Sequence, residues 1–235
     1  MVKNVAHNMD CMDYMRGLPD KAFGLCIADP PYFDGPNRRK FYGCEVNKLN
    51  IRRVDYPQTE NWDVPTADVI REIIRVSKHQ IIWGCNYYDF IFGSGRIVWD
   101  KVNGDSSFSD CEIAYCSMHD SVRLFPFMWN GMLQGKSESE GRIMQGDKSK
   151  NEVRIHQCQK PLALYRWLFQ RYWKEGWNVF DPYLGSGSSR IVAHEFGAEF
   201  VGVEKEKVHF DAQEERFAAH IAQGSLFERV EAKDG

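Results

Sequence analysis

The sequence predicts an α/β protein built on an open, mainly parallel β-sheet. Short apolar runs alternate with amphipathic helical patterns along most of the chain, which is typical of this fold class. A glycine-rich turn joins one of these runs directly to the next helical pattern. With 235 residues, of which 43% are apolar, the chain suits one domain with a sizeable core. We therefore expect a single domain over residues 1–235 that carries a small insert at residues 118–152.

The first half of the chain holds most of the strand candidates. "FGLCIA", residues 23–28, contains no charged residue, as expected for a strand buried on both faces. Thr66 caps an amphipathic pattern whose apolar positions recur at helical spacing up to about Lys78. The other elements expected here are strands at residues 3–7, 79–83, 96–99 and 111–116 and one or two helical turns at residues 10–16.

The second half opens with a polar stretch and then returns to alternation. Residues 131–151 are rich in Gly, Ser and Gln and read as exposed. Pro161 stands at a preferred early helical position, and an apolar side that includes Leu164 and Leu168 follows it. Beyond this helix we expect strands at residues 178–180 and 199–203 and helices at residues 186–196 and 205–223.

The composition excludes several classes of protein. The formal net charge of −3 argues against a histone-like polycation, although it leaves room for a local nucleic-acid-binding patch. The seven cysteines form no CxxC pair, so neither a disulfide framework nor a zinc site is indicated. The N-terminal "MVKNVAHNMD" has no signal-peptide core, and no apolar run is long enough to span a bilayer. A cytoplasmic protein without a bound metal is expected.

The first candidate site is "IADPPY", residues 27–32. Two consecutive prolines fix two φ angles and remove two backbone donors, so the stretch from Asp29 to Tyr32 should form a stiff corner that is rich in acceptors. Such a corner suits a ligand that donates hydrogen bonds and has a flat face. A strand-ending turn with a packed tyrosine is the alternative.

The second candidate site is "VFDPYLGSGSSRIVA", residues 179–193. A strand ends at Asp181, and a loop with Gly185 and Gly187 leads into a helix, so a ligand could lie between the strand end and the helix N-terminus. Glu204 follows the next strand, where a carboxylate can accept both hydroxyls of a ribose. Arg190 replaces the third glycine of the dinucleotide fingerprint, and a purely structural turn is the alternative.

Together the two motifs resemble the amino-group DNA methyltransferases. "DPPY" resembles their catalytic tetrapeptide, and "DPYLGSGSS" resembles their S-adenosylmethionine loop. "RIHQCQKPLALYRWLF", residues 154–169, is similar to the segment before that loop in permuted members, and "NMDCMDYMRGLPDKAFGLCIADPPY" is similar to their N-terminal block. The catalytic corner precedes the cofactor loop, as in the permuted β class. The runs "IIWGCNYY" and "RIVWDK" are similar to runs in small phage and prophage adenine methylases.

This resemblance implies a circularly permuted, doubly wound sheet of the S-adenosylmethionine-dependent methyltransferase (Rossmann-like) type. It also departs from the family in places. The histidine of the segment at residues 154–169 is usually followed by proline, but His156 is followed by Gln157, and Met9 stands where many relatives have glycine. These departures concern individual cofactor contacts.

The resemblance further implies methyl transfer from S-adenosyl-L-methionine to N6 of a flipped-out adenine in duplex DNA. The Asp29 carboxylate and the Pro30 carbonyl would accept the two amino hydrogens, and Tyr32 would stack on the base. The expected catalytic residues are Asp29, Pro30, Pro31 and Tyr32. The expected cofactor-binding residues are Asp10, Cys11, Asp29, Lys160, Phe180, Asp181, Gly185, Ser186, Gly187 and Glu204. For Lys160, a solvated lysine at a helix start is the alternative.

Two segments are candidates for DNA contact. The basic loop at residues 38–53 could bind phosphates, or it could simply be solvated, and its expected DNA-binding residues are Arg38, Arg39, Lys40, Arg52 and Arg53. The insert at residues 118–152 falls where the family places target recognition. Trp83, Trp99 and Asn86 could line the pocket, although core packing is the commoner role for a tryptophan. A homodimer is compatible with the resemblance.

Several other functions remain open from the sequence. A cytosine-N4 enzyme would use the same fold and chemistry, although an aspartate at the first position of the tetrapeptide favours adenine. An RNA or protein amino-group methyltransferase usually has the opposite motif order. An inactive DNA-binding relative is disfavoured, because Asp29, Tyr32 and the glycine loop are all present.

Overall fold

The computed structural model describes residues 3–32, 62–103, 109–130, 133–135 and 151–231. The predicted DNA-binding residues between Arg38 and Arg53 lie outside these ranges. The elements in chain order are β1 (Asn4–Asn8), α1 (Cys11–Arg16), β2 (Phe23–Ala28), α2 (Ala67–Val76), β3 (Ser77–Trp83), β4 (Arg96–Asp100), β5 (Cys111–Cys116), β6 (Val122–Pro126), β7 (Trp129–Asn130), β8 (Leu133–Gln134), α3 (Leu162–Tyr172), β9 (Val179–Asp181), α4 (Ser188–Glu195), β10 (Phe200–Glu204) and α5 (Lys207–Glu231).

The main sheet has eight strands in the order β1-β10-β9-β2-β3-β5-β4-β6. Its strands run parallel except β5, which is antiparallel to both β3 and β4. The first strand, β1, pairs with β10, which is the last strand along the chain. This pairing agrees with a permuted chain order, and the predicted doubly wound, mainly parallel fold is confirmed.

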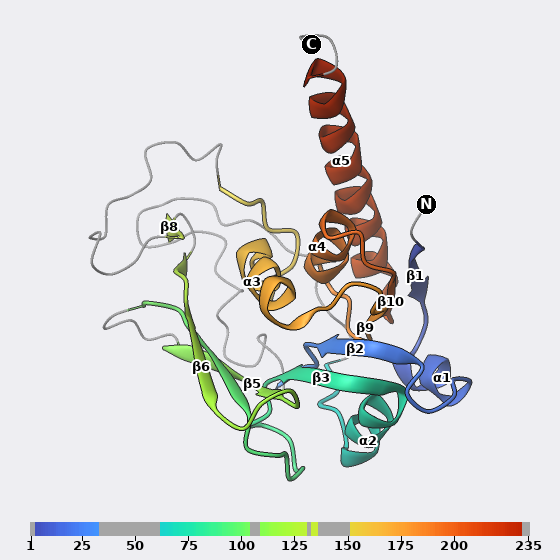
Figure 1. Cartoon of the computed structure of the whole chain (residues 1–235), viewed down its shortest axis with the longest axis vertical. Coiled ribbons are helices and arrows are strands. Elements are labelled where there is room, and N and C mark those ends of the chain that lie inside the picture. Colours follow the sequence, from blue (N-terminus) through green and yellow to red (C-terminus); the bar gives the residue numbers. More distant parts are fainter. Residues whose placement is uncertain (1–2, 33–61, 104–108, 131–132, 136–150, 232–235) are drawn as a thin grey trace.

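Helices cover both faces of the sheet (Figure 1), with α3, α4 and α5 on one side and α1 and α2 on the other. Alternate residues of β2 serve the two cores. Leu25 and Ile27 pack toward the α3 side, whereas Cys26 and Ala28 pack toward α1 and α2. Every residue of β2 is buried, which explains why its sequence is continuously apolar.

Arg190 is a buried residue of α4 that ties three elements together. Its guanidinium donates to Asn4 Oδ1 of β1 at 2.9 Å and to Gln213 Oε1 of α5 at 2.9 Å, and it pairs with Glu214 at 2.6 Å. Because these partners neutralise and satisfy the buried cation, the arginine stabilises the packing of α4 against β1 and α5. This is the structural role of the residue that replaces the third fingerprint glycine.

Several predicted boundaries were wrong. Helix α2 ends at Val76, because Ser77 and Lys78 already belong to β3. Thr66 is its N-cap residue, but the side chain makes no capping hydrogen bond. Helix α4 begins at Ser188 and not at Ser186, since Gly187 has a left-handed conformation, and α5 extends to Glu231.

The segment at residues 118–152 is more structured at its start than predicted. Strand β6 pairs in parallel with β4 and extends the main sheet at its edge. Strands β7 and β8 then form a separate two-stranded ladder. Among the described residues, no helix is both long and apolar enough to cross a membrane.

Candidate active site

The two predicted motifs lie at the same edge of the sheet. Strands β10, β9 and β2 are neighbours and run parallel, so their carboxyl ends meet. Glu204 ends β10, Asp181 ends β9, and Asp29 directly follows β2. Ligands of open α/β sheets bind at this edge, where three acidic residues are brought together from sequence positions far apart.

The first part of the site is the Asp29 cluster, which we define as Asp29, Tyr32, Lys101, Glu112 and Lys160. The Tyr32 hydroxyl donates to Asp29 Oδ1 at 2.7 Å and lies 2.9 Å from Glu112 Oε2. The Lys160 ammonium contacts Asp29 Oδ1 and lies 3.0 Å from Glu112 Oε2. Its side chain is only 4% exposed, which excludes a lysine that extends into solvent.

Burial and charge move the pKa values of this cluster apart. Burial raises the pKa of Asp29 above its usual range, and the nearby ammonium of Lys160 only partly opposes this. Burial also disfavours ionisation of Glu112, but Lys160 and Lys101 outweigh it and hold its pKa at about 2. The pKa of Lys160 is raised, because the two carboxylates outweigh its desolvation. Glu112 and Lys160 are therefore charged at neutral pH.

The ring of Tyr32 is held by the segment after β3. It stacks on Tyr87 with 5.3 Å between centroids and an interplanar angle of 7°. A Cβ at Gly84, where φ is +69°, would lie 2.2 Å from Tyr32 Cδ1, so the backbone approaches the ring as only glycine permits. Tyr88 donates to the carbonyl of Pro30 at 3.2 Å. The predicted second acceptor therefore has an internal donor in this structure.

The second part of the site is the glycine loop, which is shaped by Asp181. This carboxylate is 1% exposed and accepts from the Tyr183 amide at 3.0 Å and from the Ser189 hydroxyl. Burial raises its pKa to about 7. Gly185 and Gly187 have positive φ of 51° and 72°, so both use the conformation that favours glycine.

Glu204 faces this loop and binds it through backbone amides. Its Oε2 accepts from the amide of Gly185 at 2.8 Å, and its Oε1 accepts from the amide of Glu206 at 2.9 Å. Within the described part of the chain, neither Asp181 nor Glu204 forms an ion pair with a lysine or arginine. The carboxylate predicted at the ribose is thus next to the glycine loop, as the spacing indicated.

Lys160 connects the two parts of the site. Its side chain reaches Asp29, while its carbonyl accepts from the Ser188 hydroxyl at the start of α4 at 3.0 Å. Arg216 of α5 supports the same loop by donating to the Ser186 carbonyl at 2.7 Å, and it pairs with Glu152 at 2.7 Å. Residues before α3 and on α5 thereby fix the loop relative to the Asp29 cluster.

The remaining predicted site residues have mainly structural surroundings. Asp10 caps α1 by accepting from the Met12 amide at 2.8 Å, and burial raises the pKa of the Cys11 thiol to about 11. The Phe180 ring is buried and stacks on Phe23 with 4.6 Å between centroids. Ser186 is buried beside Ser188.

The pocket candidates from the sequence divide in the same way. Trp83 and Trp99 are buried in the core, whereas Asn86 is exposed.

Burial lowers the pKa of His156 to about 3, so this histidine is neutral at physiological pH. Among the residues that the structure describes, no group of three or more His, Cys, Asp or Glu could hold a metal ion.

Comparison with known proteins assigns the chain to a family. The family model N6_N4_Mtase, described as DNA methylase, matches residues 98–215, which make up half of the chain. The protein belongs to the N6_N4_Mtase family. The matched range holds Glu112, Lys160, Asp181 and Glu204, whereas Asp29 lies before it.

Two relatives of this N6_N4_Mtase member share a quarter or less of the aligned residues with it. It is 25% identical over 239 residues to the type II methyltransferase M.HinfI of Haemophilus influenzae, and the match covers 88% of this chain and 66% of the relative. It is 22% identical over 244 residues to the type II methyltransferase M2.MboI of Moraxella bovis, with coverage of 88% and 85%. The chain thus spans about two thirds of the length of M.HinfI.

Solved structures share the fold of this N6_N4_Mtase member. TTHA0409 of Thermus thermophilus superposes with a TM-score of 0.53 at 17% identity, covering 94% of this chain and 96% of the other. The complex of that protein with S-adenosyl-L-methionine gives 0.51 at 18% identity, covering 92% and 95%. The cytosine-N4-specific PvuII DNA methyltransferase gives 0.52 at 11% identity, covering 94% and 92%. These matches establish the fold.

Sequence reasoning missed four residues of the site. Glu112 and Lys101 complete the Asp29 cluster, Tyr88 binds the Pro30 carbonyl, and Arg216 supports the glycine loop. Glu112 left a detectable signal, because it is the lone charged residue in the strand "CEIAYC". Lys101 likewise directly follows strand β4, "RIVWD". Neither signal shows which residue Glu112 or Lys101 pairs with.

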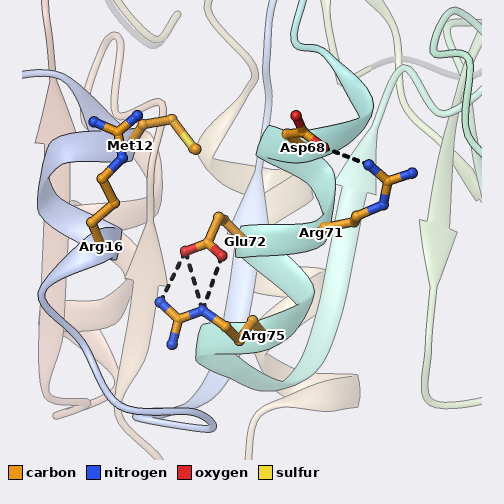
Figure 2. Close-up of a pocket in the computed structure, with 6 residues that line it drawn as sticks. All are labelled: Met12, Arg16, Asp68, Arg71, Glu72 and Arg75. Atoms are coloured by element: carbon orange, nitrogen blue, oxygen red, sulfur yellow. Dashed lines mark hydrogen bonds and ion pairs between the residues drawn. The ribbon is translucent and has the colours of Figure 1, made fainter.

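A hollow of about 420 Å³ lies elsewhere on this N6_N4_Mtase fold, between α1 and α2 (Figure 2). Four of its charged side chains form two ion pairs, Arg71–Asp68 at 2.5 Å and Arg75–Glu72 at 2.9 Å. None of the residues that line it belongs to the Asp29 cluster or the glycine loop. The hollow is separate from the candidate active site.

Proposed function

We propose that this protein methylates the N6 amino group of adenine in duplex DNA and takes the methyl group from S-adenosyl-L-methionine. The observation that carries the proposal is the link made by Lys160, which joins the Asp29 corner to the glycine loop through its side chain and its carbonyl. Family membership and the cofactor complex of TTHA0409 support the same function. The choice of adenine rests on the aspartate of the tetrapeptide.

The residues around the glycine loop fit the cofactor. S-adenosyl-L-methionine supplies an activated methyl group on a sulfonium. Glu204 would accept the ribose hydroxyls, since each of its oxygens keeps a lone pair beside the backbone amide that it already binds. A Cβ at Gly185 would meet no heavy atom nearer than 3.9 Å, so the loop has room beside it. Gly187 and Asp10 complete the proposed lining.

Asp29 would act on the amino group. The nitrogen is a weak nucleophile, because its lone pair is delocalised into the ring. A carboxylate that accepts an amino hydrogen favours the pyramidal nitrogen, and a preorganised acceptor stabilises the developing positive charge. The N–C bond would form as the S–C bond breaks, and the amino group would then lose one proton, for which Asp29 is the adjacent base. The Asp29 side chain is 19% exposed and can be reached.

The DNA would be bound by parts of the chain outside this core. The target base must leave the duplex to reach Asp29, and Tyr32 would stack on it. Residues Arg38, Arg39, Lys40, Arg52 and Arg53 would contact phosphates, and the segment at residues 118–152 would recognise the sequence. Both assignments are part of the proposal.

The test is a product analysis. Purified protein is incubated with radiolabelled S-adenosyl-L-methionine and unmethylated duplex DNA, and the DNA is digested to nucleosides. Label in N6-methyladenosine supports the full proposal. Label in N4-methylcytosine would show that the target base is cytosine, while the proposed methyl-transfer chemistry would stand. The two bases have to be distinguished because the cytosine-N4-specific PvuII methyltransferase shares the fold. Unlabelled DNA, with cofactor binding demonstrated by equilibrium dialysis, would contradict the proposed function.

A further inference from the structure

We propose that Glu112 is a positioning residue that shares the ammonium of Lys160 with Asp29 and so keeps Asp29 able to accept the target amino group. The inference deepens the proposed function and rests on it. Glu112 lies on β5, 80 positions from Tyr32, and touches no part of the glycine loop among its recorded contacts. Among the described residues, the ion pairs and side-chain hydrogen bonds of Glu112 all lie within the Asp29 cluster.

Glu112 is the carboxylate with the most charged partners in this cluster. Lys101 lies 2.6 Å from its Oε1 and Lys160 lies 3.0 Å from its Oε2. Asp29, in contrast, contacts only one of the two lysines. Because the Lys160 ammonium divides its charge and its hydrogens between two carboxylates, it cannot form an exclusive pair with Asp29.

The division leaves acceptor capacity on Asp29. Both the Tyr32 hydroxyl and the Lys160 ammonium bind Oδ1. No donor from the described residues binds Oδ2, which leaves this oxygen for an incoming amino hydrogen. Without the charge of Glu112, Lys160 would have Asp29 as its single anionic partner, and a buried, exclusive pair would compete with the substrate for the carboxylate.

Several charged or titratable groups face Asp29, and each contributes to its protonation. Lys160 favours the ionised carboxylate, whereas burial and the negative charge of Glu112 oppose it. The neighbouring elements supply the remaining groups, namely Tyr32, Tyr88, Cys158, Tyr165 and Asp181. Lys101 joins them through its ion pair with Glu112. Removing the charge of Glu112 should therefore lower the pKa of Asp29, and removing that of Lys101 should raise it.

These opposite signs define the experiment. The pKa of Asp29 is measured by ¹³C NMR on protein labelled at aspartate Cγ, with the resonance assigned by Asp29→Asn. The variants are Glu112→Gln, Lys101→Met and the control Glu195→Gln, which removes a carboxylate from an ion pair with Arg166 outside the cluster. We expect a lower pKa for Glu112→Gln, a higher one for Lys101→Met and an unchanged one for the control. This measurement needs neither cofactor nor DNA.

The functional arm compares single-turnover methyl transfer with cofactor binding. In Glu112→Gln we expect the rate at pH 7 to fall on the order of 10²-fold. The acid limb of its pH profile should move to lower pH, and the Kd for S-adenosyl-L-methionine should change less than about twofold. Glu112→Asp should restore part of the rate.

Unchanged Asp29 titrations in both cluster variants would overturn the role of Glu112, and so would a Glu112→Gln rate and pH profile equal to wild type. If Glu112→Gln does not fold, Glu112→Asp decides the question, because its shorter side chain should weaken the contact with Lys160 and lower the transfer rate while the affinity for the cofactor stays unchanged. A wild-type protein that methylates no DNA would contradict the proposed function instead, while the titrations would continue to test the charge sharing.

Discussion

The two halves of the candidate site hold their carboxylates by different means. In the Asp29 cluster, the partners of the carboxylates are two ammonium groups and a phenol hydroxyl. In the glycine loop, Asp181 and Glu204 are held by backbone amides and a serine hydroxyl. Long charged side chains can redistribute when a substrate arrives, whereas a backbone cradle is fixed by the fold. The first arrangement suits a reacting group, and the second suits a binding surface.

The strongest test of this difference removes the Asp29 carboxylate. Asp29→Ala deletes the proposed acceptor at the reacting nitrogen, so we expect methyl transfer to fall by about 10²–10³-fold or more, while cofactor affinity stays within a fewfold of wild type. Single-turnover rates and equilibrium dialysis measure the two effects separately. Glu195→Ala, which alters an ion pair at the surface of α4, is the control. An Asp29→Ala protein that retains the wild-type transfer rate would contradict this role of Asp29.

The sequence located the backbone-built half better than the ionic half. Asp181, Gly185, Gly187 and Glu204 lie within one β-α-β unit, so their spacing along the chain already reflects their spacing in the fold. The Asp29 cluster joins residues separated by up to 131 positions. No local sequence pattern indicates that Lys160, before α3, pairs with Asp29, after β2, because this pairing depends on the order of strands in the sheet.

The missed strands have a related explanation. The central strand β2 was predicted within its observed limits, because it is buried on both faces and is therefore apolar throughout. Strand β6 is an edge strand with mostly exposed residues, and β7 and β8 have two residues each. Their pairing is imposed by neighbours in space and not by their own sequence.

The backbone-built half also makes a prediction about pH. The pKa of Asp181 is raised from an ordinary 3.8 to about 7, so between roughly pH 4 and 7 the folded protein holds a proton that the unfolded chain releases. The free energy of unfolding should therefore fall as the pH rises through this range, by on the order of 4 kcal/mol at most. In Asp181→Asn this contribution is absent.

Urea denaturation of wild type and Asp181→Asn between pH 4 and 7 isolates the effect. The amide keeps an acceptor for the Tyr183 amide, and the Ser189 hydroxyl can reverse to accept from the new NH₂ group. Other titrating groups, such as His156, are common to both proteins and cancel in the difference. If that difference stayed constant over the range, the raised pKa would be refuted.

A smaller effect is expected at the proposed ribose site. Glu204→Ala removes two acceptor oxygens, so the affinity for S-adenosyl-L-methionine should fall about tenfold to a hundredfold. Asp211→Ala, on the exposed face of α5, removes a carboxylate that pairs with Lys207 and serves as the control. Isothermal titration calorimetry measures both. Equal affinity of Glu204→Ala and wild type would show that the ribose assignment is wrong.

The smallest effect is expected for alanine substitutions at two glycines with positive φ. Comparing them separates the cost of backbone strain from a role in the candidate site. Gly187 has φ +72°, and a Cβ there would lie 3.1 Å from Gln213 Oε1. Gly176 has φ +81°, and a Cβ there would meet no heavy atom within 4 Å. Alanine at either position should cost about 1–2 kcal/mol in the free energy of unfolding, because both adopt the left-handed conformation.

Beyond this shared backbone strain, the two variants should differ in their stability and in their affinity for the cofactor. Gly187→Ala also presses on Gln213, whose Oε1 accepts from Arg190 at 2.9 Å, and it shifts the start of α4 beside the proposed cofactor. We expect Gly187→Ala to be the less stable variant in urea denaturation and the only one with weakened S-adenosyl-L-methionine binding. Equal loss of affinity in Gly176→Ala would mean that general destabilisation, and not the shape of the glycine loop, controls cofactor binding.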